Sequence, residues 1–241
     1  MISKRQIKII NSLQQKKYRK STGLFVAEGK KVIQEFLNSN FELDSLFTTD
    51  EHLFALDSKV TVISEVELKK ISFLKTPNKA LALFKISDAA KVDPKGLILA
   101  LDDVRDPGNL GTIIRLCDWF GVQQLICSLE TVDCYNPKVI QATMGSLTRV
   151  NIVYTDLKNY LAETNLPIFG AFMDGNNVYK ANLPKDGILV MGNEANGVSE
   201  EISNLITEKI AIPRFGDMQQ TESLNVAMAT GILLNEFKRS N

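Results

Sequence analysis

The chain has 241 residues, and its 28 Lys and Arg balance its 28 Asp and Glu, so the formal net charge at pH 7 is zero. This length can form one large domain or two modest ones. No apolar run approaches the roughly 18–20 residues that a membrane-spanning helix needs, so we expect no membrane partner. Three cysteines without a CxxC pair and one histidine argue against a metal site. We expect no signal peptide and a reducing, cytoplasmic location.

Positive charge is concentrated near the start of the chain. Residues 4–31 contain nine Lys and Arg against a single acid, Glu28. Such a run is often only a solvated face. It is also what the neutralisation of nucleic-acid phosphates would use. The charge pattern alone leaves both interpretations open.

The first part of the chain has the pattern of a small αβ domain. Apolar residues at helical spacing predict helices near 7–13 and 32–37. A capping-box pattern at Ser64 predicts a short helix that ends near residue 73. A polar stretch at 87–96, containing a proline and a glycine, then separates this part from the rest. The predicted strands of the first part are 25–27, 43–48, 60–63 and 80–86.

The second part alternates regularly between apolar strands and helical patterns. This alternation predicts a mostly parallel sheet with helices on both faces. Ligands of such sheets bind at the carboxyl ends of the strands. The predicted strands are 97–101, 124–128, 168–172, 188–191 and 209–212. The predicted helices are about 110–120, 137–147, 157–164, 199–206 and 224–238.

The segment LDDVRDPGNLGTIIR, residues 101–115, follows the first of these later strands. It carries Asn109 in a turn rich in Asp, Pro and Gly, and Arg115 on the helix that follows. Taken alone, Asn109 is explained as a helix N-cap and Arg115 as the partner of Asp118. The functional interpretation is that the asparagine fixes the loop while the arginine meets a phosphate or a ribose hydroxyl.

Two further segments also follow predicted strands. The segment GNEANG at 192–197 is a turn pattern, and its glycines would also let backbone groups approach a ligand closely. Residues 212–225 combine Pro213, which ends a strand, with Ser223 as a candidate N-cap of the last helix. The chain contains no GxGxxG pattern and no Walker lysine, so a Rossmann-type or P-loop site is not expected.

In this order and spacing, the three segments resemble the signature motifs of the SpoU/TrmH family of RNA ribose 2′-O-methyltransferases. The resemblance covers nearly the whole chain. It implies an α/β fold in which residues 96–241 form a SPOUT catalytic domain with a mostly parallel sheet and a C-terminal trefoil knot. A linker at about 89–95 would join it to a small L30e-like αβ domain, residues 1–88, which binds the RNA substrate. Knots are rare in proteins, and no periodicity in this sequence would predict one.

The resemblance also implies the methyl donor, S-adenosylmethionine, and a set of site residues. The catalytic residues that it implies are Asn109, Arg115, Glu194, Ser223 and Asn225. The cofactor-binding residues are Gly192, Asn193, Gly197, Ile212, Pro213 and Leu224. For RNA binding we expect Lys17, Arg19, Lys20, Lys30 and Lys138. No metal is expected.

Methylation of a 2′-hydroxyl requires its proton to leave as the methyl group arrives. Arg115 matches the family arginine that is often proposed to assist this deprotonation. A guanidinium with a pKa above about 12 is a poor general base. We therefore expect Arg115 to position the nucleotide and to stabilise developing alkoxide charge. A phosphate oxygen or water is the alternative base.

The sequence departs from the family pattern at Asn193, where the family has Ala or Ser, at Gln141, where an Arg is common, and in a longer polar loop at 216–222. The L30e-like arm favours ribosomal RNA over transfer RNA as the partner, and family members are homodimers. Four alternatives stay open: a transfer RNA 2′-O-methyltransferase, a catalytically silent RNA-binding homologue, a SPOUT enzyme that methylates a base nitrogen, and an antibiotic-resistance methylase of ribosomal RNA.

Overall fold

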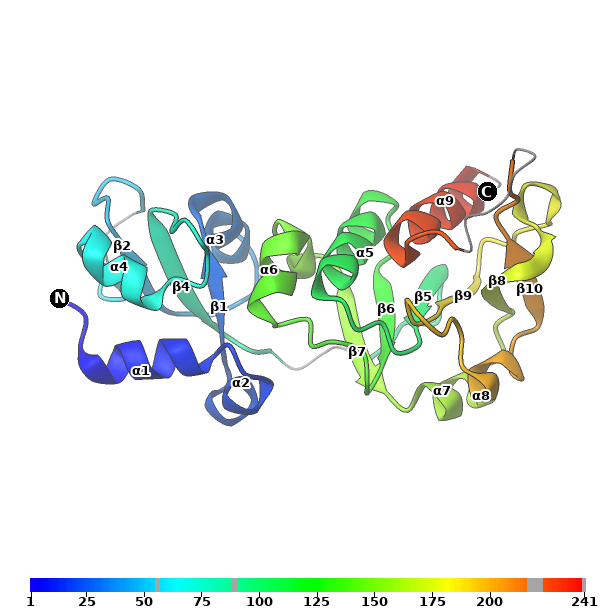
Figure 1. The fold of residues 1–241 in the computed structure, drawn as a ribbon, viewed down its shortest axis with the longest axis horizontal. Coiled ribbons are helices and arrows are strands. Elements are labelled where there is room, and N and C mark those ends of the chain that lie inside the picture. The colour runs from blue at the N-terminus through cyan, green and yellow to red at the C-terminus, as the bar shows by residue number, and fades with distance from the viewer. Residues whose placement is uncertain (55–56, 88–90, 216–222, 240–241) are drawn as a thin grey trace. The chain divides into compact units, whose positions relative to one another are not determined.

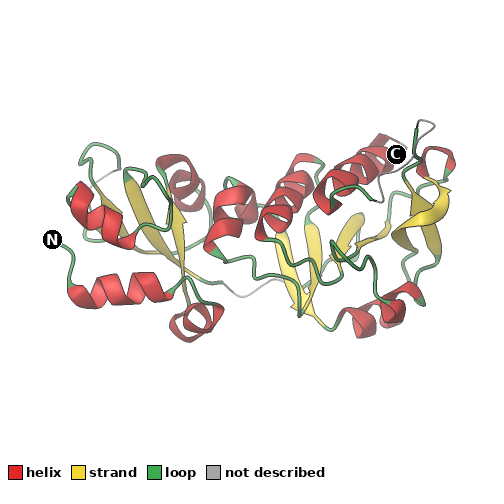
Figure 2. Ribbon diagram, in the orientation of Figure 1, coloured by secondary structure: helices red, strands yellow, loops and turns green. Residues whose placement is uncertain are grey.

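The computed structural model describes residues 1–54, 57–87, 91–215 and 223–239. The chain divides into two compact units, Met1–Asp88 with Asp133–Thr148, and Ala89–Val132 with Arg149–Asn241. Each unit contains one sheet with its own covering helices (Figures 1 and 2). The first unit thus takes in residues 133–148, which the expected boundaries assign to the second part of the chain.

The first unit has a four-stranded sheet of order β1-β4-β2-β3. Strands β1 and β2 are antiparallel to β4, whereas β3 is parallel to β2. All four strands lie within two residues of the predicted bounds: β1 (Leu24–Glu28), β2 (Leu43–Thr48), β3 (Val60–Val62) and β4 (Ala80–Lys85).

The helices of the first unit cover both faces of this sheet. Helices α1 and α4 pack together over a core that includes Ile10, Phe47 and Ile71. The predicted capping box is confirmed, since Ser64 caps α4 and Glu67 returns the hydrogen bond. Helix α2 was not predicted. The helices are α1 (Lys4–Ser12), α2 (Lys16–Thr22), α3 (Lys30–Leu37), α4 (Glu65–Ile71), α6 (Pro137–Thr143) and the short η1 (Ser146–Thr148).

Two contacts attach the segment 133–148 to the first unit. The ring of Tyr135 lies 4.9 Å from that of Phe25 on β1, against which α6 also packs. The buried guanidinium of Arg19 donates to Asp133 Oδ2 through Nε at 2.9 Å and Nη2 at 2.5 Å, and Nη1 donates to the carbonyl of Leu13 at 2.7 Å. A buried cation requires such partners, because unpaired burial of a charge is costly.

The second unit has a six-stranded parallel sheet of order β10-β8-β9-β5-β6-β7. This confirms the predicted α/β class and mostly parallel sheet. Strand β7 was not predicted, and β8 is longer than expected. The strands are β5 (Leu97–Leu101), β6 (Gln124–Ser128), β7 (Asn151–Thr155), β8 (Ile168–Asn177), β9 (Gly187–Met191) and β10 (Glu208–Ala211).

Helices cover both faces of the parallel sheet, as Figure 1 shows. Helices α5 and α9 pack side by side on one face, and α7 and α8 pack together on the other. The strands β5 and β9 at the centre are fully buried. The helices of this unit are α5 (Pro107–Trp119), α7 (Leu157–Glu163), η2 (Val178–Lys180), α8 (Glu200–Ser203) and α9 (Val226–Arg239). No helix in the described part of the chain is long and apolar enough to cross a membrane.

The connections that leave the neighbouring strands β5 and β9 run in opposite directions along the sheet. From β5 it passes through α5 to β6 on one side of the sheet, and from β9 it passes through α8 to β10 on the other. Such a reversal of strand order is the usual place for a ligand in an open α/β sheet. It brings together the loops 102–106 and 192–199. Cys117, Cys127 and Cys134 are buried and form no disulfide.

Candidate functional site

The loop after β5 leads directly into the first turn of α5. Asp106 caps this helix, since its Oδ1 accepts a 2.8 Å hydrogen bond from the backbone N–H of Asn109, and Pro107 occupies the first helical position. The alternative in which Asn109 is the N-cap is therefore wrong. Because Asp106 satisfies the backbone, the side-chain amide of Asn109 is free to make other contacts.

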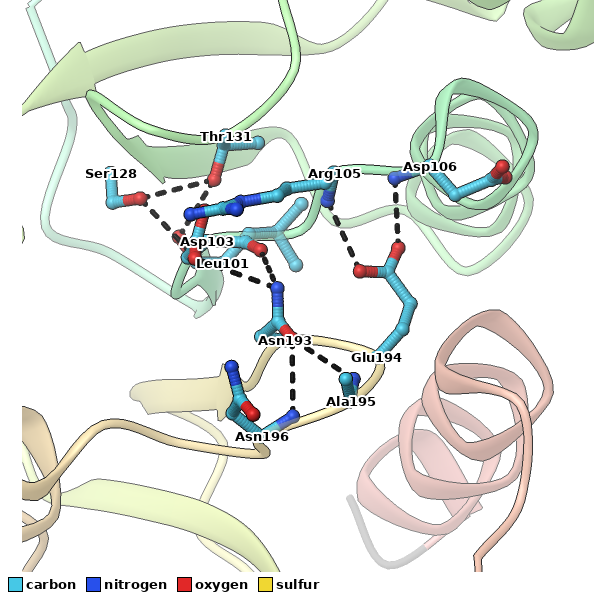
Figure 3. Close-up of polar contacts among 10 residues, drawn as sticks. All are labelled: Leu101, Asp103, Arg105, Asp106, Ser128, Thr131, Asn193, Glu194, Ala195 and Asn196. Carbon is cyan, nitrogen blue, oxygen red and sulfur yellow. Dashed lines mark hydrogen bonds and ion pairs between the residues drawn. The ribbon is translucent and has the colours of Figure 1, made fainter.

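The Glu194 carboxylate fastens the loop after β9 to this helix start. Oε2 accepts the N–H of Arg105 at 3.1 Å, and Oε1 accepts the N–H of Asp106 and Nδ2 of Asn109, both at 3.0 Å (Figure 3 draws the two backbone contacts). Partial burial raises the pKa of Glu194, but the bond from Asn109 and the backbone bonds outweigh it and leave the pKa below its ordinary value. Glu194 is therefore a carboxylate at neutral pH.

Asn225 joins the third segment to the same group. Its Nδ2 donates to Oδ1 of Asn109 at 2.9 Å, and its Oδ1 accepts the backbone N–H of Ala227 at 3.0 Å, at the start of α9. Asn225, rather than the expected Ser223, thus caps α9, and Ser223 is exposed two residues earlier. A continuous chain of hydrogen bonds, Asn225 to Asn109 to Glu194, links the three motif segments.

Arg115 lies on the exposed side of α5, two turns after the helix start. Within the described residues it makes no hydrogen bond or ion pair. Asp118, which the alternative interpretation paired with it, instead forms an ion pair with Arg149, whose Nε lies 3.0 Å from Oδ1 and 2.9 Å from Oδ2. The alternative that pairs Arg115 with Asp118 is therefore wrong.

The loop 192–197 closes on itself in a narrow turn. Backbone N–H and carbonyl groups of Asn193 and Gly197 exchange two hydrogen bonds of 2.9 Å. A Cβ on Gly192 would overlap the backbone of Gly197 and Val198, so glycine is required there. Gly197 has φ +68°, a left-handed conformation that glycine adopts without a steric penalty.

Asn193 connects the loop 192–197 to the loop after β5. Its Nδ2 donates to the carbonyl of Asp103 at 2.6 Å, and its Oδ1 accepts the N–H groups of Ala195 and Asn196 (Figure 3). Asp103 has φ +58°, a left-handed conformation that costs a non-glycine residue about 1 kcal/mol. This role of Asp103 was not predicted. The feature of the sequence that could have indicated it is the pair Asp102-Asp103 directly after a buried strand.

Ile212, Pro213 and Leu224 flank this arrangement at the end of β10 and before α9. Their backbone groups make no hydrogen bond to other described residues, and the Leu224 side chain is half-exposed. The longer loop 216–222 lies outside the described residues.

The lysines expected to bind RNA lie on the surface of the first unit. Lys17, Lys20, Lys30 and Lys138 are exposed. Arg19 is buried and held by Asp133, so it does not suit the expected contact with phosphate. No three His, Cys, Asp or Glu side chains gather into a metal-binding group within the described ranges.

Comparison with known proteins identifies the family. Residues 96–235 match the family model of the SpoU rRNA Methylase family. The chain belongs to this family. Residues 4–82 match a second model, the MRM3-like substrate binding domain. The expected SpoU/TrmH resemblance is thereby confirmed, and the protein is an RNA methyltransferase.

Similar proteins cover the chain along its whole length. A TrmH-family protein of Porphyromonas gingivalis is 37% identical, with a TM-score of 0.91 and full coverage of both chains. An AdoMet-bound rRNA methyltransferase from Sinorhizobium meliloti is 30% identical, with a TM-score of 0.86 and coverage of 99% and 97%. The 23S rRNA (guanosine(2553)-2′-O)-methyltransferase of Bacillus subtilis is 27% identical over 97% of this chain and 96% of its own length.

Proposed function

We propose that this SpoU family member transfers a methyl group from S-adenosylmethionine to a ribose 2′-hydroxyl of ribosomal RNA. The observation that carries the proposal is the chain of hydrogen bonds from Asn225 through Asn109 to Glu194. It fixes the start of α5, the loop 192–197 (the cofactor loop) and the start of α9 relative to one another, and the exposed Arg115 lies two turns along α5. The Bacillus subtilis relative, by its name, acts on a guanosine of 23S rRNA.

The cofactor would lie against residues 192–197, 212–213 and Leu224. Backbone groups of Gly192, Ile212 and Leu224 would hold its adenine, and Asn193 and Gly197 give the loop the required shape. S-adenosylmethionine supplies a methyl group on an already activated leaving group, so the protein has chiefly to orient the acceptor hydroxyl. The AdoMet-bound Sinorhizobium meliloti structure supports this donor.

Arg115 would contact the RNA at the reacting nucleotide. Its guanidinium orients the nucleotide and stabilises the alkoxide that forms as the 2′-hydroxyl loses its proton. Asn109, Glu194 and Asn225 hold the start of α5 in place, and Ser223 lies exposed at the same edge. A phosphate oxygen of the RNA or a water molecule would accept the proton.

Residues 1–88 would form the L30e-like RNA-binding domain and residues 96–241 the catalytic domain. The match of residues 4–82 to the MRM3-like substrate binding domain supports this division. The exposed Lys17, Lys20, Lys30 and Lys138 would neutralise RNA phosphates. Arg19 is left out of this surface because it is buried in an ion pair.

The active form would be a cytoplasmic homodimer with a knotted C-terminal region. Trp119 at the end of α5 is 84% exposed, and Met228 on α9 is 65% exposed. Large apolar side chains exposed on two adjacent helices are what an interface between subunits would bury.

Transfer of labelled methyl groups to unmodified ribosomal and transfer RNA tests the proposed substrate. We expect incorporation into ribosomal RNA by the wild type and a loss of about 100-fold or more in Arg115→Ala. The matched control is Lys158→Ala on α7, an exposed cation paired with Glu201, which should retain full activity. Preferential transfer to transfer RNA would overturn the choice of substrate.

A further inference from the structure

Arg105 is a second arginine at this edge of the sheet, and its side chain is fixed at one end only. Its Nε donates to Oδ1 of Asp103 at 2.7 Å, while the side chain is 69% exposed. Neither Nη atom makes a hydrogen bond to another described residue. In Figure 3 the side chain extends along the loop towards the end of β6. The guanidinium is thus oriented, and its paired Nη donors remain available.

Asp103 is itself held from two neighbouring strand ends. Its N–H donates to Oγ of Ser128 at 3.0 Å, and its carbonyl accepts Nδ2 of Asn193 at 2.6 Å. Ser128 in turn contacts Thr131, as Figure 3 shows. The strained φ of +58° at Asp103 is thereby maintained by side chains on both sides. The cofactor loop fixes Asp103, and Asp103 fixes Arg105.

The charges around Arg105 disfavour a phosphate. The hydrogen bond and charge of Asp103, with further contributions from Glu130 and Glu194, raise the pKa of the guanidinium. The acidic groups around Arg105 therefore outnumber its single positive charge, and they would repel the negative charge of a phosphate. A neutral group with hydrogen-bond acceptors avoids this repulsion. Arg115, which has no acidic partner in the described part of the chain, is the better phosphate ligand.

We propose that Arg105 reads the N7 and O6 acceptors of a guanine in the substrate RNA. The proposal rests on the proposed function as an RNA methyltransferase. The planar guanidinium presents two parallel N–H donors, which match the two adjacent acceptors of guanine, whereas adenine offers a donor at the second position. Unpaired bases in RNA loops expose this edge to side chains. Arg105 is then a specificity-determining residue beside the catalytic group.

The test replaces the guanine atom and the arginine separately and together. Two in vitro transcripts of large-subunit ribosomal RNA are prepared, one with guanosine and one with 7-deazaguanosine, which lacks N7 but pairs normally. For wild type, Arg105→Ala and Arg105→Lys, kcat/KM of methyl transfer and the RNA affinity by filter binding are measured. Melting temperature and S-adenosylmethionine affinity of each variant establish that the fold and the cofactor site are intact.

For the wild type we expect 7-deazaguanosine to lower kcat/KM and affinity about 10-fold. On the guanosine transcript, Arg105→Ala should lower kcat/KM and affinity by about the same factor. For this variant, the change from guanosine to 7-deazaguanosine should lower both values little further. Arg105→Lys should give values between those of the wild type and Arg105→Ala, because a lysine ammonium can donate to N7 and O6 but lacks the planar pair of parallel donors. Equal losses for Arg105→Ala on both transcripts would overturn the proposal. If the wild type transfers no methyl group at all, the proposed function fails, and the affinities still decide the role of Arg105.

Discussion

Asn109 and Asn225 lie 116 positions apart in the sequence, yet Nδ2 of Asn225 donates a 2.9 Å hydrogen bond to Oδ1 of Asn109. The other end of the Asn109 amide donates to Glu194. Each side-chain amide therefore uses both its oxygen and its nitrogen in hydrogen bonds. Neither amide group can flip by 180° without losing these bonds. This pair of asparagines fixes the start of α5 relative to the start of α9.

Asn109→Asp tests the role of this contact with almost no change in the size of the side chain. The new carboxylate would face Glu194 across the contact now made by Nδ2 at 3.0 Å, so two like charges would repel each other. We expect kcat/KM of methyl transfer to fall about 100-fold, the loss that a small misplacement of reacting groups produces.

The matched control for Asn109→Asp is Asn159→Asp on α7. Asn159 also follows a capping aspartate by three residues and donates through Nδ2 to Asp156 at 2.8 Å. This variant should lower the melting temperature somewhat and leave kcat/KM unchanged. Near wild-type turnover by Asn109→Asp would contradict the role given to the pair.

Glu194→Gln should remove one component of the pH dependence of stability. The pKa of Glu194 lies below its ordinary value of 4.5, because the bonds from Asn109 and the backbone outweigh the effect of burial, which raises it. A carboxyl with a lowered pKa stabilises the fold above its unfolded pKa, and this contribution is lost as the pH falls through the folded value.

Urea unfolding of wild type and Glu194→Gln at several pH values measures this contribution. The wild type should be the more stable above about pH 5, and the difference should shrink as the pH falls below the unfolded pKa. A difference that stays constant from neutral pH to pH 3 would show that the charge of Glu194 does not stabilise the folded state.

Gly192→Ala should disrupt the cofactor loop, because its Cβ would overlap backbone atoms of Gly197 and Val198 that cannot move independently. We expect S-adenosylmethionine affinity, measured by calorimetry, to fall at least about 10-fold. Gly231→Ala on α9 is the matched control. There a Cβ meets only Leu116 at an ordinary 3.5 Å, and the change should stabilise the helix by about 0.5–1 kcal/mol. Unchanged affinity in Gly192→Ala would contradict the placement of the cofactor.

Most of the regular structure followed from local sequence patterns. The predicted strands 97–101 and 124–128 are strands β5 and β6 with the predicted bounds. Strand β7, NIVYT, was missed; it is an edge strand of half-buried residues, and its apolar run is only three residues long. Helix α2 was missed because its exposed residues are polar and basic.

The sequence indicated residues of the candidate site but not the contacts that they make with one another. The motifs indicated Asn109, Glu194 and Asn225, whereas their mutual hydrogen bonds depend on which strand ends meet in the folded sheet. The same limit explains Arg19. In the sequence it belongs to a basic run, and nothing local indicates that Asp133 neutralises it. The roles of Asp103 and Arg105 required the observed loop geometry.

Asp133→Asn should destabilise the first unit. It leaves the Arg19 guanidinium, 3% exposed, without a counter-charge, and breaking a buried pair in this way costs about 3–5 kcal/mol. Thermal unfolding would show a loss of this order. Lys20→Ala, at the exposed neighbour of Arg19, should leave the melting temperature unchanged and weaken RNA binding at low salt. A fully stable Asp133→Asn variant would contradict the structural role of this pair.

The position of the transferred methyl group tests the central claim most directly. Ribosomal RNA labelled by the wild type from radioactive S-adenosylmethionine is hydrolysed in alkali, which cleaves the chain only next to free 2′-hydroxyls. The account predicts that the label remains in alkali-stable dinucleotides and is absent with Arg115→Ala. Label in mononucleotides would indicate methylation of a base. Cofactor binding without any incorporation would indicate an RNA-binding homologue that does not catalyse transfer, and either result would contradict the account.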